Sequence, residues 1–234
     1  MTVSVPNPNI ETALEHAILA GKRERVARDH WYASSLGQCL RKQVAERAGF
    51  SPTNPPDARG LFKMMVGTVI GKEIQALLEA EGYLDPAWHE KHFTYKSVTG
   101  KVDGYTDRIE GGAIVEIKTS DDRSITKYQD MPEHYLWQGM FYCLASGIRT
   151  LLVFQVGKNQ GITRHRVVYL DAQWEKSLNE HIGFLDREWT RFQERGGRVE
   201  DLPDHLHNFG WEERLCSMNE GDDVQQVTKE DEQG

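Results

Sequence analysis

The sequence predicts an α/β or α+β fold in which a central mixed β-sheet is flanked by helices. Segments with the apolar period of a helix alternate with segments of period two, and turns containing Gly or Pro separate them. The order is helix, three strands, helix, two strands, helix. With 234 residues, 38% of them hydrophobic, the chain is long enough to bury a core between such layers.

Two helices are expected in the N-terminal part of the chain. Residues 9–27 place apolar side chains near helical spacing. Residues 34–49 predict the second helix, which Ser34 or Ser35 caps and Gly49 ends.

A loop and a long helix are predicted next. Residues 50–60 contain three Pro and predict the loop, and residues 61–82 predict the helix. Gly67 and Gly71 lie on one face of this helix, where they permit close packing against a neighbouring helix or against the sheet.

The apolar period then changes to that of strands. Three successive strands joined by short turns that contain Gly are predicted over residues 89–98, 100–109 and 112–120. A helix, two strands and a polar helix follow over residues 131–147, 149–159, 163–171 and 172–196.

Composition limits the class of protein. No apolar run is long enough to span a membrane, and the N-terminus shows no secretory signal. Three cysteines give no disulfide framework, so a cytoplasmic location is expected. The net charge of −8 disfavours a broad surface that coats nucleic acid but permits a local basic groove.

One predicted strand carries a charged pair among apolar residues. In residues 112–120, Glu116 and Lys118 point to the same face, roughly 7 Å apart at Cα. A hairpin through the glycines at 111–112 would bring Asp103 of the preceding strand near Glu116. A charged pair in a buried strand is costly unless it binds something.

These side chains predict a metal site. The carboxylates of Asp103 and Glu116 and the backbone carbonyl of Ile117 are hard oxygen ligands that suit Mg²⁺ or Mn²⁺. Such an ion could activate water and neutralise charge on a phosphoryl group, and Lys118 could orient the water or stabilise the developing oxyanion. The alternative is a solvated ion pair on an edge strand. The apolar neighbours of Glu116 and the position of the hairpin in the middle of the chain favour the metal site.

Four short motifs resemble a known family. "GKVDGYTD" and "AIVEIKTS" resemble the D…E-x-K core of the PD-(D/E)XK nuclease superfamily, and "PEHYLWQGMFYCLASG" resembles the Q-x3-Y helix of its RecB-like branch. "SSLGQCLRK" and "WEERLC" resemble terminal segments of CRISPR-associated RecB-type nucleases and their phage relatives. The resemblance spans residues 34–216. It implies a restriction-endonuclease-like αβββαβ core and metal-dependent cleavage of DNA, often from its ends.

The resemblance also implies roles for individual residues. The implied catalytic set is Asp103, Glu116, Lys118, Gln138 and Tyr142. The two carboxylates match metal ligands of the family, and the lysine matches its catalytic lysine. Gln138 and Tyr142 share a helix face with Tyr135, from which they could contact the DNA backbone or position Lys118. Alternatively, the two tyrosines are half-buried residues with hydrated hydroxyls.

The sequence departs from the family's pattern at a further metal ligand. The family often has His four residues after the Gly of the long helix, and counting from Gly67 gives Gly71 here. Glu73 is the nearest acid and a candidate accessory residue, although it points to another part of the helix surface. His89 and His92 either approach the site or lie on a surface strand.

The sequence also departs from the family at its iron–sulfur cluster, which uses four cysteines. Cys39 and Cys216 match two of them, Glu213 stands where another would be, and Cys143 fits a core position. Because two thiolates cannot hold such a cluster, no iron–sulfur cluster is expected. Trp211 and the N-terminal helix are expected to hold the ends of the chain by packing instead.

The sequence therefore predicts a Mg²⁺- or Mn²⁺-dependent exonuclease of phage-type recombination, replication or repair. Two alternatives stay open: a catalytically weak nuclease-fold subunit that binds DNA or forms a scaffold in a recombination complex, and a structure-specific endonuclease. The expected partners are DNA ends and recombination proteins, and a phage-encoded chain would act in the bacterial host cytoplasm. The candidate DNA-binding cations are Arg41, Lys42, Lys91, Lys96 and Lys101.

Four regions are expected along the chain. Residues 1–60 form an N-terminal helical region, and residues 61–196 form the nuclease core. Residues 197–218 form a segment that packs near the N-terminal region. Residues 219–234 are acidic and nearly free of apolar side chains, which predicts a disordered tail.

Overall fold

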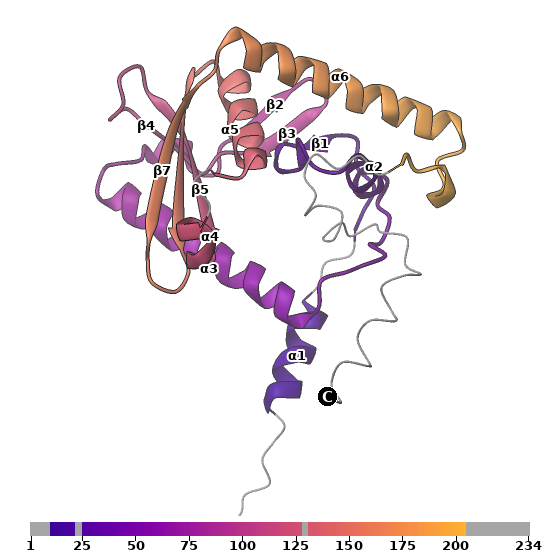
Figure 1. The fold of residues 1–234 in the computed structure, drawn as a ribbon, viewed down its shortest axis with the longest axis horizontal. Coiled ribbons are helices and arrows are strands. Elements are labelled where there is room, and N and C mark those ends of the chain that lie inside the picture. Colours follow the sequence, from indigo (N-terminus) through magenta and orange to yellow (C-terminus); the bar gives the residue numbers. More distant parts are fainter. Residues whose placement is uncertain (1–9, 22–24, 128–130, 205–234) are drawn as a thin grey trace, which may run out of the picture.

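A computed structural model describes residues 10–21, 25–127 and 131–204 of the chain (Figure 1). The helices and strands in these residues are α1 (Ile10–Ala20), β1 (Trp31–Tyr32), α2 (Leu40–Ala48), α3 (Ala58–Ala80), β2 (His92–Tyr95), β3 (Val98–Lys101), β4 (Gly104–Thr106), β5 (Ala113–Ser120), α4 (Asp122–Lys127), α5 (Glu133–Ser146), β6 (Thr150–Gly157), β7 (Thr163–Tyr169) and α6 (Ala172–Glu194). This mixed content confirms the predicted fold class. None of the described helices is long and apolar enough to cross a bilayer.

Within the described residues the strands form two mixed sheets. One has the order β1-β3-β2, in which β1 is parallel and β2 antiparallel to β3. The other has the order β4-β5-β6-β7, in which β5 and β6 are parallel and the two outer pairs are antiparallel. β5 is therefore a central strand, and it is buried from Ala113 to Ile117.

Helices cover both faces of the β4–β7 sheet, and α6 lies over α5 (Figure 1). Val115 and Ile117 pack toward α3 in a small apolar cluster. Ile114 belongs to the main core, which α5 and α6 complete. Because side chains alternate along a strand, Glu116 and Lys118 point to the same side as Ile114, toward α5.

The strand predicted over residues 100–109 is instead two strands in different sheets. β3 ends at Lys101 and β4 begins at Gly104. The prediction is wrong there because Asp103 makes hydrogen bonds to distant parts of the chain in place of ladder bonds. Its carboxylate accepts a hydrogen bond from the N–H of Ile117 at 2.7 Å, and its backbone carbonyl accepts one from the Gln75 amide at 2.5 Å.

Helix α2 starts later than predicted. The two expected serine caps lie in a 3₁₀ turn, Ala33–Ser35. Gly37 then takes a left-handed φ of 75° beside Trp137, which interrupts a helix. The helix therefore begins at Leu40, and it ends as predicted at Gly49, whose φ is 79°.

The two glycines of α3 differ in their surroundings. A Cβ at Gly67 would lie 2.8 Å from the hydroxyl oxygen of Thr119, which confirms close packing against β5. A Cβ at Gly71 would have nothing within 4 Å, so close packing at this second glycine was wrongly predicted. At the N-terminus, α1 also ends sooner than predicted, at Ala20.

Candidate active site

The register of β4 and β5 places two carboxylates opposite each other. Gly104 pairs with Val115 in this antiparallel ladder, so the next residues along it are Asp103 and Glu116. Beyond the end of β4, the Ile117 N–H donates a hydrogen bond to the Asp103 carboxylate, which holds this side chain against β5. The structure thus places Asp103 beside Glu116, as the predicted hairpin requires.

Helix α5 supplies the polar side chains that meet this pair. The Lys118 ammonium donates to Glu116 Oε2 at 2.7 Å and to Gln138 Oε1 at 2.8 Å. The Gln138 amide donates to the Tyr142 hydroxyl at 3.5 Å, and the Tyr135 ring lies 5.5 Å from the Lys118 nitrogen. The residues predicted as catalytic therefore lie in one cluster between β5 and α5.

One oxygen of this cluster has no hydrogen-bond partner among the residues that the structure describes. Glu116 is 0% exposed, and among the described residues none donates a hydrogen bond to its Oε1. An unsatisfied buried oxygen on a charged group costs free energy. The site is therefore suited to a ligand that a carboxylate can bind.

Burial controls the protonation of the three charged groups. It raises the pKa of Glu116 to about 8, which Lys118 opposes and Asp103 reinforces. It also raises the pKa of Asp103, against the effects of Lys118 and of the Ile117 N–H. Burial acts to lower the pKa of Lys118, but the charges of Glu116 and Asp103 outweigh it, so this pKa is raised. Fully ionised, the cluster has a net charge of −1, which a bound cation would offset.

The sequence did not predict the part that Gln75 of α3 plays. Its buried amide donates to the Asp103 carbonyl and lies 3.0 Å from His89 Nδ1, which is itself 2.7 Å from Glu79. These contacts hold the turn that carries Asp103. The available signal was helical spacing, because Gln75 follows Gly71 by four residues on the same helix face.

Two other sequence candidates lie at the surface. Glu73 is exposed on α3, and His92 is exposed on β2. Among the described residues, no group of three or more His, Cys, Asp or Glu side chains could hold a metal ion. The carboxylates that the cluster offers to a cation are those of Asp103 and Glu116.

The Ile117 carbonyl suits the role predicted for it. In a strand, the N–H and C=O of one residue point to the same edge. The Ile117 N–H points to Asp103, so its carbonyl faces that side, away from β6. β4 pairs with β5 only as far as Val115, so the ladder does not continue to this carbonyl.

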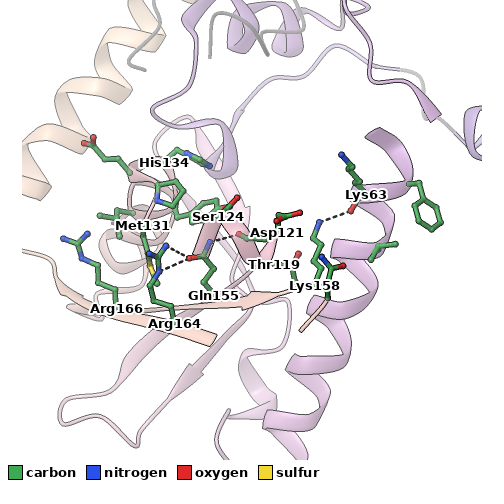
Figure 2. A pocket seen from close by; sticks show the side chains of 18 of the residues that line it. Lys63, Thr119, Asp121, Ser124, Met131, His134, Gln155, Lys158, Arg164 and Arg166 are labelled. Atoms are coloured by element: carbon green, nitrogen blue, oxygen red, sulfur yellow. Dashed lines mark hydrogen bonds between the residues drawn. The ribbon is translucent and has the colours of Figure 1, made fainter. Parts of the chain in front are cut away.

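Figure 2 shows the residues that line a pocket of about 1420 Å³. Its walls include Tyr135, whose ring faces Lys118, and Thr119, the next residue in β5. Asp103, Glu116, Lys118 and Gln138 do not line it. Its cationic lining side chains are Lys63, Lys158, Arg164 and Arg166.

The five cations predicted to contact DNA do not line this pocket. Each has a partner within the chain. Four donate hydrogen bonds: Arg41 to the Leu202 carbonyl, Lys42 to Gln38, Lys96 to Asn179 and Lys101 to Glu90. The fifth, Lys91, lies over the ring of Trp88. Their contact with DNA stays a prediction.

The side chains of Cys39 and Cys143 are buried. Burial raises the pKa of Cys143 to about 12, which suits the core position expected for it on α5. Trp211, Glu213 and Cys216 lie outside the described residues. The expected absence of an iron–sulfur cluster and the packing of the chain ends therefore stay predictions, as does the division into four regions.

The sequence matches no family model and no curated protein. Solved structures that resemble the chain include SSO0001, with a TM-score of 0.55 and 12% identity over 89% of this chain and 93% of that one. They also include the alkaline exonuclease LHK-Exo from Laribacter hongkongensis, with a TM-score of 0.47 and 14% identity over 80% and 98% of the two chains. For LHK-Exo in complex with dAMP the TM-score is 0.43, with 14% identity over 71% and 97%. At 12% identity, the likeness to SSO0001 is one of fold alone.

Proposed function

We propose that this chain is a Mg²⁺- or Mn²⁺-dependent deoxyribonuclease that hydrolyses phosphodiester bonds from DNA ends. The observation that carries the proposal is the cluster of Asp103, Lys118 and the fully buried Glu116, in which one Glu116 oxygen has no partner among the described residues. The resemblance of the motifs to PD-(D/E)XK nucleases of the RecB-like branch supports the same function. Recombination proteins as further partners, and a bacterial host cytoplasm as the location, rest on that resemblance alone.

The cluster fits a divalent cation. Asp103 and Glu116 would hold it with carboxylate oxygens and Ile117 with its carbonyl, the oxygen ligands that Mg²⁺ and Mn²⁺ prefer. The Glu116 oxygen that lacks a partner among the described residues favours a cation there, as does the net charge of −1 that the cluster has when fully ionised. When bound, it would supply Lewis-acid chemistry, which lowers the pKa of water and neutralises charge on a phosphoryl oxygen.

Lys118 would act on the substrate as a fixed positive charge. Its raised pKa keeps it protonated at neutral pH. Glu116 and Gln138 hold the ammonium in place, from where it can orient a water or stabilise charge that develops on the phosphate. Gln138 is a positioning residue. Burial, reinforced by Glu116, raises the pKa of Tyr142 well above its ordinary value, so its phenol stays neutral and acts through hydrogen bonds.

Digestion of DNA tests the proposal directly. End-labelled linear DNA, single-stranded and double-stranded, should be degraded with Mg²⁺ or Mn²⁺ and left intact with EDTA, while covalently closed circles resist. Cleavage of covalently closed circles would show that the activity is that of an endonuclease and not of an exonuclease. DNA that is bound but never cut with either metal would favour the scaffold alternative.

Mg²⁺ should bind more tightly as the pH rises. A proton and the cation compete for Glu116, whose pKa is about 8, so the apparent Kd should fall about tenfold per pH unit below 8 and level off above it. Calorimetry at pH 7 in two buffers of different ionisation enthalpy should detect release of about one proton per Mg²⁺. A Kd that does not change between pH 6.5 and 8.5 would exclude Glu116 as a ligand. The variant Asp107→Asn, altered at an exposed carboxylate beyond the end of β4, should behave as wild type.

A further inference from the structure

A row of polar side chains crosses the β4–β7 sheet from the catalytic cluster to strand β7. Lys118 lies opposite Gln155 on β6, and Gln155 lies opposite Arg164 on β7. Residues directly opposite in neighbouring strands share a face of the sheet, so Arg164 stands on the face that carries Lys118. Two strand spacings, roughly 9.6 Å, separate their Cα atoms.

A buried amide holds the Arg164 guanidinium. Gln155 is 1% exposed, and its Oε1 accepts hydrogen bonds from Arg164 Nη2 at 2.7 Å and Nε at 3.2 Å (Figure 2). The other end of the amide is fixed as well, because it donates to the Ser120 hydroxyl at 2.6 Å. An amide orients a guanidinium without neutralising it. This contact therefore fixes the position of the guanidinium.

Among the described residues that line the surrounding pocket, cations outnumber carboxylates, although the whole chain has a net charge of −8. Arg164 shares the lining with three further cations, against the two carboxylates of Asp121 and Glu133. His134 adds no charge at neutral pH, because burial and the nearby lysines lower its pKa to about 4. Met131 and Trp174 contribute apolar wall. Cations beside apolar wall suit a ligand with an anionic part and a flat apolar part, which a nucleotide has.

We propose that this pocket holds a nucleotide adjacent to the scissile phosphate and that Arg164 binds a phosphate of that strand. The inference rests on the proposed nuclease function and names the residue that places the substrate strand. Contacts to phosphate fix the position of a nucleic acid without reading its bases. Loss of Arg164 should therefore weaken DNA binding, with little change in the rate at which bound DNA is cleaved.

The test measures binding without cleavage. A fluorescein-labelled single-stranded DNA oligonucleotide is titrated in EDTA at several salt concentrations. Arg164→Gln should raise Kd roughly tenfold, the scale of a hydrogen bond between charged groups. The slope of log Kd against log salt should fall by about 0.7, the value for one phosphate contact on a single strand. With Mg²⁺ present, KM should rise and kcat should stay near wild type.

Matched variants separate charge from position. Arg164→Lys keeps the charge, so the slope of log Kd against log salt should equal that of the wild type. The DNA affinity should be only partly restored. Gln155→Leu should weaken binding by roughly threefold with the slope unchanged, because it removes only the group that orients the guanidinium. Arg187→Gln, on the exposed surface of α6 and outside the pocket, should bind as wild type. Thermal melts check that each variant is folded.

The outcomes distinguish this inference from the function on which it rests. Wild-type protein that binds and cuts DNA, with Arg164→Gln and Arg164→Lys both keeping the wild-type Kd and slope, would overturn the role of Arg164 alone. Wild-type protein that neither binds nor cuts DNA would overturn the nuclease proposal and this inference together.

Discussion

Lys118→Ala is expected to lower the rate of DNA cleavage by roughly 10²-fold or more while Mg²⁺ binding survives. This is the scale of losing one electrostatic donor that stabilises the transition state. Lys118 is the cation that touches Glu116 and Gln138 in the cluster, so its loss removes the fixed positive charge and leaves both carboxylates for the metal. Single-turnover cleavage at saturating Mg²⁺ measures the rate, and calorimetry measures the Mg²⁺ affinity.

The variant needs two controls. Lys118 offsets two buried carboxylates, so Lys118→Gln, which keeps polar contacts without the charge, should be compared with Lys118→Ala by circular dichroism and thermal melting. Lys176→Ala removes a lysine that is 67% exposed on α6 and should cut DNA at the wild-type rate. If both Lys118 variants fold and cut DNA at the wild-type rate, Lys118 has no role in catalysis.

Glu116→Gln is expected to weaken Mg²⁺ binding by at least roughly 100-fold and to abolish measurable cleavage at millimolar Mg²⁺. Loss of a group that only supports a metal ligand costs 10–100-fold in affinity, and Glu116 is proposed as a ligand itself. Gln has nearly the shape of Glu but no charge, so the effect reports on charge rather than on packing. Asp103→Asn should also weaken Mg²⁺ binding and cleavage. Asp107→Asn, which alters an exposed carboxylate, should bind Mg²⁺ and cut DNA as the wild type does.

The same variant should be more stable than wild type in alkaline, metal-free solution. The pKa of Glu116 rises from 4.5 to about 8 on burial, so ionisation is resisted in the folded state. The wild type should therefore lose stability as the pH rises from 4.5 to above 8, whereas Glu116→Gln should not lose this contribution. Thermal melts in EDTA should show similar melting temperatures near pH 5 and a higher one for the variant at pH 9.

Addition of Mg²⁺ completes the experiment. It should raise the melting temperature of the wild type at pH 9, because a ligand bound only to the folded state stabilises it, and should leave Glu116→Gln nearly unchanged. A wild type with no Mg²⁺ response, or a variant that responds equally, would contradict the assignment of Glu116 to the metal site.

Much of the candidate active site could be predicted from the sequence because the relevant patterns are local. Alternation along β5 is enough to put Glu116 and Lys118 on one face, and helical spacing along α5 is enough to align Tyr135, Gln138 and Tyr142. The three-to-four and two-residue periods come from backbone geometry alone. They hold whatever the rest of the chain does.

Other features depend on segments that are far apart in the sequence. The bend at Asp103 requires the amide of Gln75 from α3 and the N–H of Ile117 from β5, and no local pattern around residue 103 contains either partner. The short helix α4 was also not predicted. Its buried residue Asp122 accepts backbone hydrogen bonds from Asn159 and Gln160, so a distant turn helps to hold it in place.

By itself, the sequence determined the fold class, the charged face of β5 and the polar face of α5, because periodicity encodes which side of an element is buried. Only the tertiary structure decided that Gln155 and Arg164 continue that charged face across the sheet. Their place depends on the register of β5 with β6 and of β6 with β7. A shift of one residue in either ladder would turn the row to the other face, and that register is set by the packing of the whole core rather than by any one strand.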